Sequence, residues 1–198
     1  MIGLKASFIK RLGAFLIDSF ILSFIITLIS MGFNKNTNDI NKEINELLEQ
    51  YQNGEVTIEE YADKFISLNY ELQKSSLSSN VLNITFYVGY FMIFGYLNKG
   101  QTIGKKICKI KVVNSSGDNP SIWNMVVRSL FIYGLFTLLF SVIFVNVLNT
   151  KVFTTGYLII TYIDSIIMII CLFMVLYKKD GRGLHDIIAR TNVIEEVR

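Results

Sequence analysis

Four apolar segments dominate the pattern of this 198-residue chain, and each is long enough to cross a lipid bilayer. A transmembrane helix needs about 17–25 mostly apolar residues. By this criterion the spans are Leu12–Phe33, Val81–Leu97, Ile122–Leu148 and Thr154–Tyr177. The pattern predicts an all-α integral membrane protein with four transmembrane helices.

The polar segment 34–80, between the first two spans, carries a helical pattern of its own. Its first half places apolar residues on one helical face, namely Ile40, Ile44, Leu47, Leu48 and Tyr51. Asn53-Gly54 predicts a turn, and Thr57 with Glu60 predicts a capping box that starts a second helix. We therefore expect a helical hairpin. Its apolar stripes either pack only on each other or also form a docking surface for a partner.

The segment 98–121 combines a glycine-rich start with a short alternating pattern. Cys108, Ile110 and Val112 alternate with lysines, which predicts a strand and a small β-hairpin at the membrane surface. The motif Gly100, Thr102, Gly104 and Lys105 invites comparison with a phosphate-binding loop. Its spacing is one residue short, and a lysine stands where magnesium needs Ser or Thr, so nucleotide binding is not expected.

The distribution of charge predicts the orientation of the chain. Lysine and arginine gather in residues 1–11, 98–121 and 178–198, whereas residues 34–80 hold nine acids against four lysines. Basic segments remain on the cytosolic side of a membrane. We therefore predict cytosolic N and C termini and an extracytosolic hairpin. The chain then divides into six units: the first span with its basic N-terminus (1–33), the hairpin (34–80), the second span (81–97), the basic loop (98–121), the third and fourth spans (122–177) and the tail (178–198).

Ionisable residues within the spans are the main candidates for function, because charge at membrane depth is costly. Asp18 and Arg128 lie at similar predicted depth and are expected to pair, and Asp186 is expected to pair with Arg11. Asp164 lies near the midplane without a predicted cation. It is either a protonated acid, hydrogen-bonded by Thr161, Tyr162 or Ser165, or a site of cation and proton exchange.

Other chemistry finds little support in the sequence. Cys108 and Cys171 fall in different compartments, so no disulfide is expected, and His185 has no clustered ligands for a metal site. The tail 178–198 reads as amphipathic, with Leu184, Ile187 and Ile188 in the interface. We expect no catalytic residues, no cofactor and no nucleic-acid partner.

These motifs, in this order, resemble the RDD family of bacterial membrane proteins. The resemblance rests on residues spread over Arg11–Val193: Arg11, Asp18, Gly100, Thr102, Gly104, Lys105, Val112, Val113, Gly117, Pro120, Ser121, Arg128, Leu184, His185, Asp186, Ala189 and Thr191. The chain differs from the family pattern at Arg190, where the family often has glycine, and in the long segment 34–80, which resembles an insertion. Asp164 is not part of the family pattern.

The resemblance implies a small multi-span protein of the bacterial cytoplasmic membrane. For its function we expect a non-catalytic accessory or regulatory subunit that binds a membrane-protein partner or a second copy of itself. The alternative is a Na⁺- or proton-coupled transporter that uses Asp18 and Asp164. A large folded outer segment favours the first, and two carboxylates on separate helices form a sparse ion path.

Overall fold

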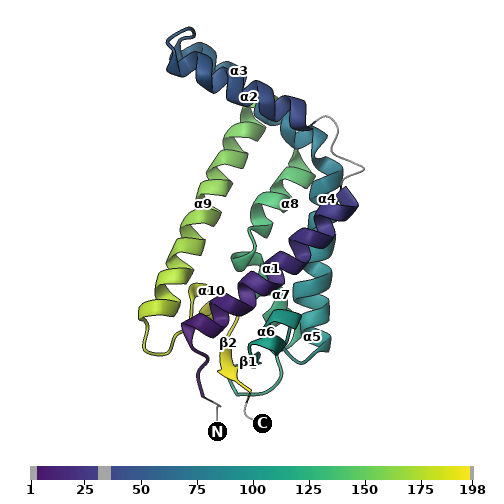
Figure 1. Ribbon diagram of the computed structural model, residues 1–198, viewed down its shortest axis with the longest axis vertical. Coiled ribbons are helices and arrows are strands. Elements are labelled where there is room, and N and C mark those ends of the chain that lie inside the picture. Colours follow the sequence, from purple (N-terminus) through teal and green to yellow (C-terminus); the bar gives the residue numbers. More distant parts are fainter. Residues whose placement is uncertain (1–3, 31–36, 197–198) are drawn as a thin grey trace.

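The computed structural model describes residues 4–30 and 37–196, and its chain is mostly helical (Figure 1). Three helical segments are long and apolar enough to cross a membrane: α1 (Phe8–Ser30), the segment Leu77–Leu97 and α9 (Thr150–Tyr177). A bent pair of shorter helices is a fourth candidate when the pair is counted as one span. The predicted helical membrane class is thus confirmed, although the expected end of the first span at Phe33 lies outside the described residues.

The second span contains a stretch of wider helix. It runs through α4 (Leu77–Tyr87), the π-helix η1 (Val88–Phe94) and α5 (Gly95–Leu97). It starts four residues before the predicted Val81, because α3 leads into it through a turn at Ser76 alone. Such π-helical turns often occur at functional sites, and this one holds Tyr90, a residue of the site described below.

The third span is broken, which corrects the continuous helix predicted over Ile122–Leu148. It consists of α7 (Ile122–Ile132) and α8 (Leu135–Phe144), which meet at an angle of 85°. Gly134 lies at the break with φ +62°, a left-handed conformation that glycine adopts without steric cost. The break leaves the first amide groups of α8 without partners from their own helix.

The acidic segment between the first two spans forms the predicted helical hairpin from α2 (Thr37–Gln52) and α3 (Ile58–Ser75). Thr57 and Glu60 form the expected capping box, and the rings of Tyr51 and Tyr61 lie 4.8 Å apart between the two helices. Helix α3 rests on the start of α9, where the Thr154 hydroxyl donates to the carbonyl of Ile66 at 3.1 Å. The hairpin extends beyond α9 at one end of the bundle (Figure 1).

The opposite end carries a small cap built from the loop and the tail. It contains α6 (Ile103–Ile107), β1 (Ile110–Asn114), α10 (Leu184–Ile188) and β2 (Thr191–Glu195). The predicted local β-hairpin is wrong, because β1 pairs antiparallel with β2, and Val112 lies opposite Val193. The turn after Asn114 leads into α7 rather than into a returning strand.

The tail packs into this cap, and its place relative to the membrane interface stays a prediction. Its helix α10 has only five residues, and His185 and Asp186 are buried within the cap. The core of the cap joins residues from the segment before α1, α1 itself, the loop, α7 and the tail: Ala6, Ala14, Ile110, Val112, Met125 and Val193. The loop and the tail therefore fold as one unit against the start of α1.

The segment that leads into α1 and strand β2 lie at the cap, and the acidic hairpin lies at the far end of the bundle (Figure 1). The basic and acidic segments are thus separated by the length of the spans, which is the arrangement that the charge distribution requires. That the cap lies on the cytosolic side of the membrane stays a prediction.

We predict that a membrane-impermeant maleimide labels Glu55→Cys, at the hairpin turn, in intact cells. It should label Lys179→Cys, beside the cap, only after permeabilisation, because both residues are exposed but on opposite sides. The measurement uses a background with Cys108 and Cys171 replaced by Ser. Labelling of Lys179→Cys in intact cells would contradict the orientation.

Candidate functional site

Asp18 is bound by three fixed donors from the second span and the loop. Its carboxylate accepts from the hydroxyl of Tyr90 at 2.6 Å, from that of Thr102 at 2.5 Å and from the amide of Gly104 at 2.7 Å. The expected pair with Arg128 is wrong. Three hydrogen bonds to a carboxylate compensate for its removal from water, so this charge holds the loop against α1.

The loop motif is shaped to reach this carboxylate. Thr102 is the N-cap of α6, so its hydroxyl and the amide of Gly104 in the first turn both reach Asp18. A Cβ on Gly104 would lie 2.3 Å from the carbonyl oxygen of Ala14, and only glycine allows such a close approach. Gly100, at φ +89°, similarly lies against the carbonyl of Val112. The motif does bind an anion, and that anion is a side chain of the same protein.

Asp186 forms the second network, at the centre of the cap. Its side chain is completely buried and lies 3.0 Å from Arg11, which confirms the expected pair. Arg128 donates to the other carboxylate oxygen, and the amide of Gly183 donates at 3.2 Å. One carboxylate thus joins α1, α7 and the tail. Arg128 is directed to Asp186 and therefore does not pair with Asp18.

His185 lies beside this network, with its Nε2 3.4 Å from an oxygen of Asp186. Burial is the largest cause that lowers the pKa of His185, and the charges of Arg128 and Arg11 lower it further. The imidazole is therefore neutral at pH 7. It adds no charge to the cap.

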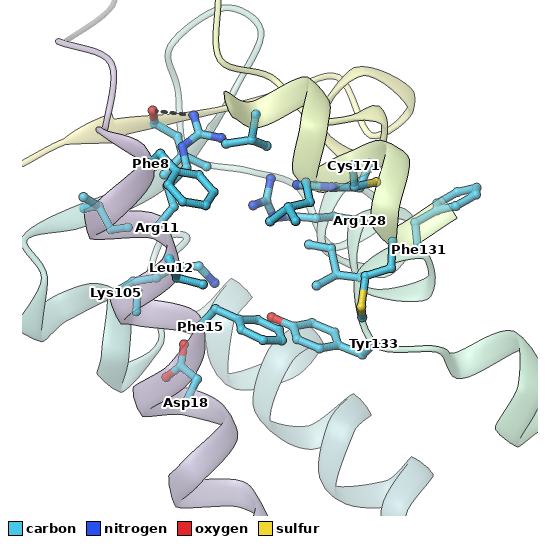
Figure 2. A pocket seen from close by; sticks show the side chains of 18 of the residues that line it. Phe8, Arg11, Leu12, Phe15, Asp18, Lys105, Arg128, Phe131, Tyr133 and Cys171 are labelled. Carbon is cyan, nitrogen blue, oxygen red and sulfur yellow. Dashed lines mark hydrogen bonds between the residues drawn. The ribbon is translucent and has the colours of Figure 1, made fainter. Parts of the chain in front are cut away.

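An apolar cavity of about 320 Å³ lies between α1, α7 and α9, next to both networks. In Figure 2, Leu12 and Phe15 of α1 lie on one side of the cavity, and Phe131 lies on the other. Its polar lining includes Arg11, Asp18, Lys105, Arg128 and His185. Burial is the main cause that lowers the pKa of Lys105 to about 8, and the charge of Arg128 adds to it.

A comparison with protein families matches the RDD family over residues 5–190. The chain belongs to the RDD family. Neither the curated proteins nor the solved structures give a match to it. The RDD resemblance seen in the sequence is thus confirmed over nearly the whole chain. Arg190, where the family often has glycine, has φ +51°, so the position adopts a backbone conformation that suits glycine.

Asp164, in the middle of α9, forms a separate, third network. It accepts from the hydroxyl of Thr137 at 2.6 Å and from its amide at 3.1 Å. The expected donors are wrong, because Thr161 and Ser165 donate to carbonyls of their own helix and Tyr162 is exposed. An unsatisfied amide in hydrocarbon costs several kcal/mol. Asp164 therefore caps α8 where the third span breaks.

The three carboxylates are thus kept apart, each with its own donors. Within residues 4–30 and 37–196, no group of three or more His, Cys, Asp or Glu side chains could hold a metal ion. Sequence reasoning missed Tyr90 and Thr137. Both look like ordinary residues of an apolar span, and only the fold shows that they face a carboxylate.

We predict that Gly104→Ala lowers stability by about 1–3 kcal/mol, because the added methyl group forces the loop away from α1. The measurement is the free energy of unfolding of the purified protein in mixed micelles. Gly89→Ala is the matched control, since a Cβ there meets nothing within 4 Å. Equal stability of the two variants would show that the loop does not depend on this close approach.

Proposed function

We propose that this RDD protein is a non-catalytic accessory or regulatory subunit in the bacterial cytoplasmic membrane. The observation that carries the proposal is the state of its carboxylates. A coupled transporter needs an acid that exchanges a proton for a cation during the cycle. Asp18 and Asp186 are instead buried among fixed donors and arginines, which suits a structural role.

The outer hairpin is the surface that we propose for the partner. It extends beyond the bundle, and its tip exposes apolar side chains, with Ile58 60% exposed and Leu48 and Tyr51 also accessible. Along the groove between its helices Glu43, Glu46 and Glu71 outnumber Lys64. We infer that the partner is a membrane protein with a basic extracytosolic segment that also covers the apolar tip.

One observation favours the alternative, a cation- or proton-coupled transporter. Broken transmembrane helices often form ion sites, because the ends of the half-helices face the ligand. Here the third span breaks beside Asp164, and that side chain is only partly buried. The alternative therefore centres on Asp164, and Asp18 is less suited to exchange.

Photo-crosslinking in the native membrane tests the accessory role. A photoreactive residue in place of Ile58 should give one discrete protein adduct, and Glu43→Lys with Glu46→Lys should reduce its yield severalfold. A photoreactive residue in place of Tyr162, which is exposed in the middle of α9, serves as the control. The same adduct at the same yield after charge reversal would contradict the proposed contact.

Ion flux in vesicles tests the alternative with Asp164→Asn, which keeps an acceptor oxygen for Thr137 but removes the charge. The accessory proposal predicts no sodium- or proton-coupled flux for the unaltered chain or for Asp164→Asn. Flux with the unaltered chain that disappears with Asp164→Asn would replace the accessory role by transport.

A further inference from the structure

The cavity between α1, α7 and α9 has a basic end that its own residues leave incompletely neutralised. Arg11, Arg128 and Lys105 line it, and they face the two carboxylates Asp18 and Asp186. His185 is neutral, so one positive charge remains in excess. Asp186 is shared by the two arginines. The charge of Asp18 acts on Lys105, but the Asp18 oxygens are bound by Tyr90, Thr102 and Gly104, so Lys105 forms no ion pair with it.

Lys105 is the residue that points to a ligand. Its side chain is more than nine-tenths buried, with 8% exposed, and its amine reaches towards the cavity (Figure 2). No hydrogen bond or ion pair of this amine occurs with any residue in the described part of the chain. Burying an unpaired ammonium group is costly, and an anion beside it removes most of that cost.

Arg11 supplies a second unsatisfied donor at the same end. Its Nη atoms bind Asp186 and the carbonyl of Val193, but its Nε is buried without an acceptor among the described residues. Arg11 on α1 and Lys105 on the loop thus line a single cavity, and the Nε of Arg11 is enclosed beside it. This is the arrangement expected of an anion site and not of a packing defect.

The rest of the cavity is apolar and borders the surfaces that face the bilayer. On α1 its wall includes Phe8, Leu12 and Phe15, and on α9 it includes Met168, Ile169 and Leu172. Leu12, Met168, Ile169 and Leu172 are also exposed on the outside of the helices. A ligand can therefore place hydrocarbon between α1 and α9 and remain in contact with lipid.

From this geometry we propose that the cavity binds one anionic membrane lipid. Its phosphate lies against Lys105 and Arg11, and one acyl chain lies between α1 and α9. The volume of about 320 Å³ suits part of a lipid, at the lower end of the range of about 300–1,000 Å³ for ligand pockets. Basic pockets between transmembrane helices bind phosphate headgroups in this way. The site is independent of the proposed accessory role.

Lipid titration of the purified full-length protein in neutral detergent tests the proposal. Phosphatidylglycerol should raise the unfolding temperature and bind in native mass spectra as a single retained molecule, whereas phosphatidylcholine should not. Lys105→Gln should weaken binding about tenfold, which is the effect of losing one charge-assisted hydrogen bond. Lys106→Gln is the matched control, because Lys106 is exposed on the same helix.

The shape of the cavity is tested separately by Met168→Trp, which adds bulk at its edge and leaves every charge in place. This variant should also lose the retained lipid, so the proposal stays testable if Lys105→Gln folds poorly. Equal binding of phosphatidylcholine, or equal losses for Lys105→Gln and Lys106→Gln, would overturn the proposal. If inorganic phosphate alone raised the unfolding temperature as much as phosphatidylglycerol does, the site would bind a free anion, and the lipid proposal would be wrong.

Discussion

The buried carboxylate of Asp186, held between Arg11 and Arg128, is the interaction on which the rest of the structure depends. It joins the first helix, the first half of the broken third span and the C-terminal tail, which are separated by up to 175 residues in the chain. A charge without water is stable only with such partners. Asp18 is also bound by several donors and holds the loop against α1. Asp164 accepts two hydrogen bonds from Thr137 where the third span breaks.

These three networks explain how a protein of this size keeps its spans in register. Packing between apolar helices alone has little driving force within lipid, so polar contacts and close backbone approaches contribute more there than in water. The cap uses both, through Asp18 and Gly104. In the cavity beside the cap, the positive charges of Arg11, Arg128 and Lys105 outnumber the negative charges of Asp18 and Asp186. The basic end of the cavity therefore suits an anionic ligand.

Run length, periodicity and charge were sufficient to predict the membrane class, the helical hairpin and the pair of Arg11 with Asp186. Depth along the membrane could be estimated from the sequence, but the direction of each side chain could not. Arg128 therefore had the correct depth for Asp18 and yet binds Asp186. The partner of β1 lies about 80 residues away in the tail, and no local pattern indicates such a pairing. The break at Gly134 is likewise hidden within a continuous apolar run.

The stability of Asp186→Asn tests the central claim most directly. Removing the charge leaves Arg11 and Arg128 buried beside each other, so the free energy of unfolding in mixed micelles should fall by about 3–5 kcal/mol. Asp180→Asn, on the same tail but exposed and paired with Arg182, should leave stability nearly unchanged. Equal, small effects of the two substitutions would contradict the account.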